Sequence, residues 1–524
     1  MKKAVRLIAM FLCLCMLLSA CGPTGEPGGT QAPGTQNPEG SQPPAVKEHT
    51  TLNIPMLSDA TQLDPHVSNG TDYNIICSIY DSLVRFNGSN QFEVIPDLAE
   101  SWEISEDQME FTFHLRQAKW SDGSDFTADD VVFSIERMQT QPSTASKVLM
   151  IKGAEKVDEH TVKILCNYAY PNLILQMASW PWRMVSKKAV EAAGDGVQGM
   201  VIGTGPYKLE SWTPGIGVTL ARNEYYWGDT PYFEKVVFKI VTDNTTGIAA
   251  LENGELDMTQ LINGLDIDYY STAPGFRVET IKRPGAYTVA FNTSSSPSLA
   301  KKEVRQAFNY AIDQESLVKL VYDGHAIPNT YSIISEGEEG YTTDLPHYDY
   351  NVETAKQLLA DAGYPDGVSI KFTYPTTDLG ERVAAALKEM VSAAGITLEL
   401  VPTEYSAYLA ASYTGDYESI YLEWQSVPYN PPLVYNLYFI STGSMCYCRT
   451  KDSYIDETAA QAAQTLDDAA RNQLYQDLNR HIRDEAYYAI IGGISTNFVY
   501  NEHIQGVERE PNTLISKFGD WYWE

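Results

Sequence analysis

Apolar residues recur along this chain at two spacings, and the spacing changes several times. They occupy every second position of residues 111–116, which predicts a half-buried strand. In residues 299–312 they fall three and four positions apart, which predicts a helix with one apolar face. Residues 466–482 show the same helical spacing. Strands and helices are therefore expected to be mixed throughout the chain.

The clearest local signals lie in the second half of the sequence. Asn351 is a good N-cap for a helix that runs to Ala362, and Gly363 fits the position just after its end. A second helix with an apolar face ends at Gly395 and is followed by an alternating strand, residues 396–400. Because helix, glycine and strand follow one another twice, this region predicts an α/β lobe with a largely parallel sheet.

Residues 1–20 have the pattern of a secretory signal peptide. Three basic residues precede an apolar run of about twelve residues, whereas a membrane span needs roughly twenty. The run ends in Ser19-Ala20-Cys21, which resembles the lipobox of bacterial lipoproteins. The resemblance implies that Cys21 carries a lipid such as palmitate and becomes the first mature residue. The alternative is an ordinary signal peptide with a chance cysteine.

Residues 21–47 are rich in Pro, Gly, Thr and Gln and contain almost no large apolar side chain. Such a segment cannot bury enough surface to offset its ordering entropy, so we expect a disordered tether. A lipid followed by a tether predicts a globular body that works close to a membrane. No other stretch of the sequence has the length and apolar content of a membrane span.

The charge of the chain narrows the range of partners. The formal net charge is −31, and removing a signal peptide with three basic residues and no acidic residue leaves −34. Such a field repels phosphate backbones, which argues against nucleic acid as a partner. It also repels anionic lipid headgroups, so any anchoring is expected to come from the lipid itself.

Four cysteines remain beyond the signal peptide and Cys21, namely Cys77, Cys166, Cys446 and Cys448. An even number in an exported protein permits disulfides, but free buried thiols are an equally good interpretation. No CxxC pair is present, so the sequence gives no support for a zinc ribbon or a thioredoxin-like site.

Motifs of covalent catalysis are missing from the sequence. HExxH, GxSxG and a Walker A loop do not occur, and the eight histidines are scattered. Residues 194–199 match GxGxxG but follow a helix-like stretch, Lys187 to Ala193, where a dinucleotide site requires a strand. We therefore expect a protein that is not an enzyme and has no metal or cofactor.

Aromatic residues are abundant, with 34 tyrosines and nine tryptophans. Several fall in loop-like, Pro-rich stretches, residues 180–182 and 424–438. Tyr and Trp offer flat apolar faces with a polar tip, which suits them to hold a ligand out of water. Each one taken singly is better interpreted as core, but a cluster in loops favours a binding cleft.

Residues 96–138 resemble the signature of the family 5 extracellular solute-binding proteins, the oligopeptide, dipeptide and nickel receptors of ABC importers. The resemblance rests on Trp120-Ser121-Asp122-Gly123 followed by residues 126–132, FTADDVV. Further matches at residues 203–207, 289–328 and 348–367 extend the resemblance over nearly the whole mature chain.

The resemblance implies a two-lobed α/β fold like that of periplasmic binding proteins, with two crossing strands and an extra subdomain on lobe I. The expected parts are the signal peptide (1–20), the tether (21–47), lobe I (48–86), its extra subdomain (87–202), lobe I again (203–289), lobe II (290–490) and a return to lobe I (491–524).

The resemblance also implies a mechanism. A monomeric receptor on the extracytoplasmic face of the cell membrane closes around a small solute and then docks on ABC permease subunits. The receptor itself does no covalent chemistry in this family.

One departure from the family pattern bears on the ligand. Peptide-binding members carry an Asp that pairs with the peptide ammonium group, and Val427 stands in its place here, with Asn430 at a second Asp position. A buried ammonium group needs a charged partner, so either another acid substitutes or the ligand lacks that charge. The alternatives are therefore an oligopeptide, an oligosaccharide or another uncharged solute, and, from other classes, a surface peptide sensor or a hydrolase.

Loop position and resemblance together give a set of candidate ligand-binding residues. They are Trp424, Tyr429 and Asn430, Tyr73 and Asn74, and Trp180 and Trp182.

Overall fold

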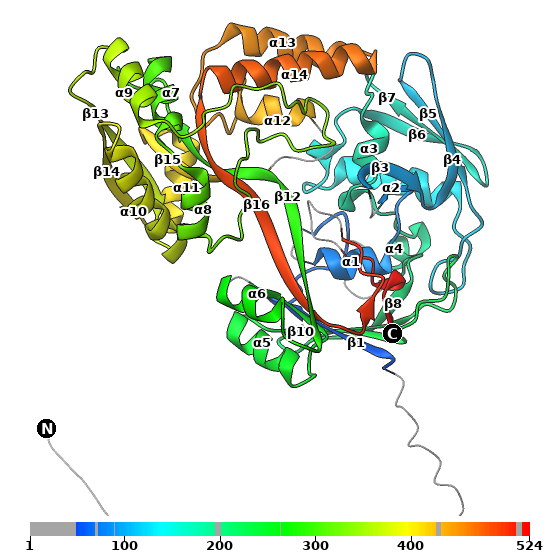
Figure 1. Cartoon of the computed structure of the whole chain (residues 1–524). Helices are drawn as coiled ribbons and strands as arrows, with labels where there is room; N and C mark the ends of the chain where they lie inside the picture. The colour runs from blue at the N-terminus through cyan, green and yellow to red at the C-terminus, as the bar shows by residue number, and fades with distance from the viewer. Residues whose placement is uncertain are drawn as a thin grey trace, which may run out of the picture. The chain divides into compact units, whose positions relative to one another are not determined.

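Two long strands, β12 (Phe276–Phe291) and β16 (Tyr488–Asn501), run antiparallel through the centre of the molecule (Figure 1). They belong to a six-stranded sheet with the order β11-β16-β12-β15-β13-β14. This computed structural model describes residues 49–68, 72–87, 90–193, 201–261, 264–425, 431–509 and 516–524. The predicted signal peptide, tether and lipid site at Cys21 lie outside the described residues.

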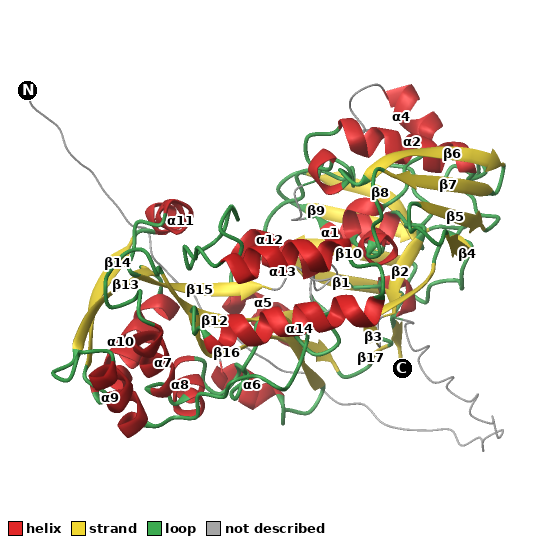
Figure 2. Ribbon diagram, turned by 90° about the horizontal axis from the view of Figure 1, so that it is seen from above, coloured by secondary structure: helices red, strands yellow, loops and turns green. Residues whose placement is uncertain are grey.

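Lobe II is the part built on β13, β14 and β15 at one end of this sheet. Strand β13 pairs in parallel with both β14 and β15, as expected from the helix–glycine–strand pattern. Helices α7 to α10 cover one face, and α11 packs with α12, α13 and α14 on the other (Figure 2). The elements of lobe II are β13 (Val368–Pro375), β14 (Ile396–Thr403), β15 (Ser419–Gln425), α7 (Lys302–Tyr310), α8 (Gln314–Val321), α9 (Val352–Asp361), α10 (Asp378–Ser392), α11 (Tyr405–Thr414), α12 (Pro431–Tyr438), α13 (Ser453–Gln464) and α14 (Asp468–Asp484).

Lobe I contains a separate four-stranded sheet, ordered β1-β10-β9-β8, in which β1 and β10 are parallel. Its core includes residues from both ends of the described chain, such as Leu52 and Trp521. The elements of lobe I are β1 (Thr51–Met56), α1 (Tyr73–Ile79), β8 (Tyr207–Thr213), β9 (Gly217–Arg222), β10 (Lys235–Ile240), α5 (Asn244–Glu252), β11 (Met258–Leu261), α6 (Gly264–Tyr270), β17 (Ile504–Gln505), η3 (Phe518–Asp520) and β18 (Tyr522–Trp523).

An extra subdomain carries its own antiparallel sheet, ordered β4-β5-β7-β6, and its own core. Asp130 in the first turn of its main helix accepts a hydrogen bond from the Thr127 backbone N–H at 3.0 Å, which closes the helix start. The elements are β2 (Val84–Asn87), β3 (Asn90–Pro96), β4 (Ala99–Ile104), β5 (Glu110–Leu115), α2 (Ala128–Thr140), η1 (Ala145–Lys147), β6 (Ile151–Asp158), β7 (Thr161–Cys166), α3 (Leu173–Met177), η2 (Trp180–Trp182) and α4 (Lys187–Ala193).

The local predictions in the second half of the chain are confirmed. The Asn351 side chain accepts a hydrogen bond from the Thr354 N–H at 3.0 Å, and α9 begins at the next residue. Gly363 and Gly395 have φ angles of +87° and +89°, a region that favours glycine. The expected α/β two-lobed fold is therefore present, while the residue boundaries of the lobes stay a prediction.

None of the four cysteines Cys77, Cys166, Cys446 and Cys448 forms a disulfide with another described residue. Of the two interpretations the sequence left open, the structure therefore agrees with thiols and not with disulfides. Helix α4 precedes the GxGxxG segment as expected, but that segment lies outside the described residues. Among the described residues, no helix has both the length and the apolar character needed to cross a membrane.

Candidate functional site

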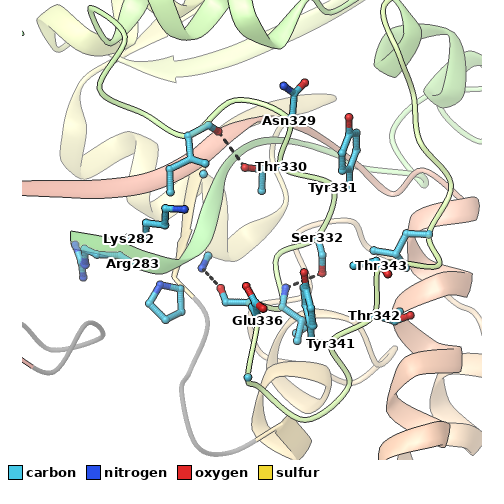
Figure 3. A pocket seen from close by; sticks show the side chains of 18 of the residues that line it. Lys282, Arg283, Asn329, Thr330, Tyr331, Ser332, Glu336, Tyr341, Thr342 and Thr343 are labelled. Carbon is cyan, nitrogen blue, oxygen red and sulfur yellow. Dashed lines mark hydrogen bonds between the residues drawn. The ribbon is translucent and has the colours of Figure 1, made fainter. Parts of the chain in front are cut away.

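A cavity of about 690 Å³ opens beside the crossing strands, within the usual range of small-molecule sites of roughly 300–1,000 Å³. Its walls come from three parts of the chain: residues 282–285 of β12, the segment 327–347 between α8 and α9, and Gly493 of β16 (Figure 3). We call 327–347 the cavity segment. Every wall is therefore either one of the crossing strands or directly attached to one.

The strand β12 is irregular where it borders the cavity. The pairing of β12 with β16 shifts register between Arg283 and Ala286, and Pro284 lies within the shift. Proline cannot donate to a strand ladder, and a bulge re-aims the side chains around it. The local irregularity thus turns residues 282–285 toward the cavity instead of along the flat sheet.

Gly493 lets the cavity segment approach the sheet. The Ile327 and Gly493 backbones exchange two hydrogen bonds, of 3.0 and 2.7 Å. A Cβ atom on Gly493 would lie 2.8 Å from Thr330 Oγ1, a distance that real Cβ atoms essentially never show, and at a tight 3.0 Å from Ile327 Cβ. Glycine is required here because the segment that forms the cavity wall lies directly on this strand.

Aromatic rings form one side of the cavity. The Tyr331 and His347 rings stack with centroids 3.9 Å apart and an interplanar angle of 8°. Burial, with the nearby Asp349 carboxylate, raises the pKa of Tyr331, so its phenol is a neutral hydrogen-bonding group at physiological pH. Figure 3 shows Tyr331 facing Lys282 across the cavity, with Glu336 and Tyr341 along a third side.

Charged side chains line the cavity as well. Arg283 Nη1 lies 4.0 Å from Glu423 Oε1 on the neighbouring strand β15. Lys282 and Glu336 are both exposed and both line the cavity. Neither Lys282 nor Glu336 takes part in an ion pair anywhere in the described part of the chain. The cavity thus combines an aromatic wall, apolar side chains such as Ile334 and charges of both signs.

The structure brings two of the sequence-predicted residues together on the lobe I side. The Tyr73 and Trp180 rings lie 4.5 Å apart, and Lys147 Nζ lies 4.7 Å from the Trp180 ring centre. Asn74 Oδ1 accepts a hydrogen bond from the Ser516 N–H at 2.8 Å, which ties α1 to the C-terminal segment. Trp182 is 1% exposed and belongs to the subdomain core.

Trp424 lies in a packed core of lobe II. It is 2% exposed, and its ring contacts those of Tyr438, Phe439 and Tyr488 at centroid distances of 5.0–5.7 Å. Tyr429 and Asn430, with Val427, lie outside the described residues. The residues that line the cavity had no counterpart among the predicted ones. The available signal was the polar, Gly- and Glu-containing stretch 335–343 in the long connection between α8 and α9, which is typical of a binding loop.

Among the described residues, no group of three His, Cys, Asp or Glu side chains could hold a metal ion. The cavity itself offers shape, stacked rings and charged side chains. These are the means by which a protein binds an organic solute.

Known proteins resemble this chain over most of its length. The family described as bacterial extracellular solute-binding proteins, family 5, middle, matches residues 93–445. The dipeptide-binding protein of Escherichia coli K12 is 26% identical over 479 residues, covering 85% of this chain and 89% of that protein. The oligopeptide-binding protein OppA of Bacillus subtilis 168 is 25% identical, with 97% of each chain covered.

A solved structure agrees with this likeness. HbpA2 from Haemophilus parasuis superimposes with a TM-score of 0.81 at 27% identity, covering 90% of this chain and all of that one. The resemblance predicted from residues 96–138 is thereby confirmed. With its two-lobed fold and a family match over more than half its length, the chain belongs to the bacterial extracellular solute-binding proteins of family 5.

Proposed function

We propose that this protein is a lipid-anchored receptor of an ABC importer that captures a solute between its lobes and delivers it to the permease. Membership of a solute-binding family supports the capture step. The named relatives, a dipeptide-binding and an oligopeptide-binding protein, support an oligopeptide-class solute. The relatives are binding proteins, which supports a receptor that performs no covalent chemistry.

The observation that carries the proposal is the position of the cavity on the crossing strands. Residues 282–285 and Gly493 lie on the two strands that join the lobes, so a bound solute contacts those strands directly. Contacts that form only when the lobes are closed shift the population toward the closed state. Solute binding in this cavity would therefore favour closure of the two lobes.

Tyr73 and Trp180 are the lobe I residues that we propose to contact the solute. The two rings are tilted against each other. Tyr73 is partly buried, and little of Trp180 is exposed. Together with Lys147 they form an aromatic and cationic cluster on the lobe opposite the cavity segment. Tyr429 and Asn430 are retained as proposed contacts from the loop after β15.

Calorimetric titration and mass spectrometry test the capture step. The purified mature protein is titrated with pools of di- to pentapeptides and with oligosaccharides. Each bound solute is recovered, and its mass is measured. Binding of an intact peptide supports the proposal, whereas binding of oligosaccharides alone supports the alternative receptor. A recovered solute that has been cleaved would identify a hydrolase.

The anchoring step has its own test. Cys21→Ser should move the protein from the membrane fraction to the medium or periplasm, with solute affinity unchanged. Cells that carry this variant should take up the solute poorly. Uptake that is lost in the absence of the protein identifies an importer, whereas solute binding without any effect on uptake identifies a sensor.

A further inference from the structure

A second cavity lies on lobe II, beyond the end of β12. Its volume is about 770 Å³, and it shares no lining residue with the cavity on the crossing strands. We call it the β13 pocket, because Lys371 and Thr373 of β13 line it. Its other lining residues fall within 292–295 after β12, at Val401 of β14, within 414–418 between the end of α11 and β15, and within 441–451 after α12.

The β13 pocket gathers positive charge in an acidic protein. The whole chain has 68 acidic side chains and 37 lysines and arginines. In the pocket the balance is reversed, since the acidic side chains are Asp416 and Glu418 and the basic ones are Lys371, Arg449 and Lys451. None of the three basic side chains forms an ion pair with another residue that the structure describes. The pocket therefore carries positive charge that an anionic ligand would balance.

The C-terminal end of α11 holds the Arg449 side chain in place. Arg449 Nη2 donates hydrogen bonds to the carbonyls of Tyr413 and Ser412, at 2.5 and 3.4 Å. Gly415 makes room for the guanidinium group, because a Cβ atom there would lie 2.6 Å from Arg449 Nε. Arg449 itself has a φ angle of +49°, which is uncommon for a residue with a side chain. The guanidinium charge is thus fixed at the pocket wall before a ligand arrives.

A buried hydroxyl group in the pocket is available for a ligand. Thr373 is 5% exposed, and its hydroxyl forms no hydrogen bond with the described part of the chain. Its neighbours Phe372 and Tyr374 belong to the core on the other face of the sheet. Because side chains alternate along a strand, Thr373 and Lys371 point to the pocket side together. A threonine hydroxyl can donate to an anionic oxygen.

We propose that the β13 pocket is a second ligand site, which binds a small sugar phosphate through Lys371, Arg449, Lys451 and the Thr373 hydroxyl. A phosphate ester carries a charge of about −1.5 to −2 near pH 7 and several strong acceptor oxygens, which matches three cations and a donor. The pocket is far larger than a bare phosphate, so it has room for an organic part. The site is independent of the solute captured on the crossing strands.

The rest of the pocket suits the sugar part of such a ligand. Polar side chains dominate its lining, and they can exchange hydrogen bonds with sugar hydroxyl groups. They include Asn292, Ser294, Ser295, Thr414 and Ser441. The overall negative charge of the protein opposes the distant approach of any anion, but salt at physiological strength screens this field beyond about 8 Å. The charges of the pocket itself therefore decide binding.

Titration calorimetry tests the ligand class. The mature protein is titrated with glucose-6-phosphate, ribose-5-phosphate and glycerol-3-phosphate at about 150 mM salt, and with the same compounds without phosphate. At least one ester should bind about tenfold or more tightly than its parent compound and than inorganic phosphate. Absence of binding for all three esters at up to about 10 mM would overturn the proposal, as would equal binding of ester and parent. Equal binding of the ester and inorganic phosphate would overturn the assignment of a sugar phosphate.

Variants of the pocket test the position of the ligand by the sign of the effect. Lys371→Gln and Lys451→Gln should each weaken ester binding by about tenfold, whereas Asp416→Asn should strengthen it by about threefold. Thr373→Val keeps the shape of the side chain and should weaken binding by about fivefold. Lys388→Gln, exposed on α10 outside the pocket, is the matched control and should behave as the wild type. Binding that none of the pocket variants changes would overturn the proposal.

Two further variants separate this pocket from the cavity on the crossing strands. Lys282→Gln and Tyr331→Ala alter that cavity and should leave ester binding unchanged. Ester binding that is lost in these two variants and kept in the lysine variants of the β13 pocket would place the ester in the other cavity and overturn the proposal. Lys371 and Lys451 are exposed, so their variants test the pocket even if Thr373→Val lowers the stability of the fold.

Discussion

Two segments of lobe II carry aromatic side chains, and they use them in opposite ways. In the segment from Trp424 to Phe439, the described rings turn inward, and Tyr435 and Phe439 are each 1% exposed. In the cavity segment, Tyr331 and His347 stack on each other and still face the cavity. Aromatic density along a sequence therefore marks a core as readily as a site. The two segments differ in what their rings contact: the rings of the first pack into a core, whereas Tyr331 and His347 line the cavity.

The largest effect in this comparison should come from Trp424→Ala. Removing a fully packed indole should lower the free energy of unfolding by about 3–5 kcal/mol, because the surrounding rings cannot close the space. Solute affinity of the folded fraction should stay within about twofold of the wild type. Urea denaturation and calorimetry measure the two quantities. A loss of affinity at full stability would instead place Trp424 in the site.

A packed region of lobe I extends the comparison to pH. His66 is fully buried, and its Nε2–H donates to the Arg183 carbonyl at 2.9 Å. Burial lowers the pKa of His66 to about 4, although the Asp64 carboxylate opposes the shift. As the pH falls from 6.5 to 4, His66 becomes protonated in the unfolded chain but stays neutral in the folded protein. This difference lowers the free energy of unfolding by up to roughly 3 kcal/mol.

His66→Gln should remove this penalty. The variant should be less stable than the wild type at pH 7.5, because a packed ring is lost, and the deficit should shrink as the pH is lowered to 4. Asp81, whose pKa burial and the Asp97 charge raise to about 6, acts with the opposite sign but is present in both proteins. A deficit that is constant with pH would show that His66 does not titrate as inferred.

Tyr331→Ala and Tyr350→Ala form a matched pair of variants that tests the cavity wall. Loss of the ring from the cavity wall should weaken solute binding by about 1–3 kcal/mol and leave the melting temperature nearly unchanged. Tyr350→Ala removes a half-exposed ring that does not line the cavity, and it should change neither quantity. An equal loss of affinity in both variants would contradict the assignment of the cavity wall.

The smallest expected effect lies just beyond the cavity segment, at the start of α9. Asn351→Ala removes the cap of α9 and should cost about 1 kcal/mol of stability. Asn351→Ser keeps a capping oxygen and should restore most of it. Solute affinity should be unaffected, because α9 lies beyond the cavity. Reduced affinity would show that helix capping also fixes the geometry of the cavity wall.

Local sequence signals were sufficient for several helix boundaries of this protein. The Asn351 cap, Gly363 and Gly395 each determine a helix boundary through contacts within a few residues. The cavity could not be predicted in this way. It depends on Gly493 meeting Ile327 across a long chain separation, and on a register shift at Arg283 that no local pattern encodes. Trp424 shows the same limit, since its burial is decided by distant rings such as Tyr488.

The positions of the crossing strands along the chain determine when folding can be completed. Phe276 lies opposite Asn501, and β11 pairs with residues 497–500, so these ladders join segments far apart in the sequence. The six-stranded sheet cannot be completed until β16 has been synthesised. Contacts of such long range also form slowly. The core of lobe I consequently cannot be completed until its C-terminal residues Phe498, Tyr500 and Trp521 are present.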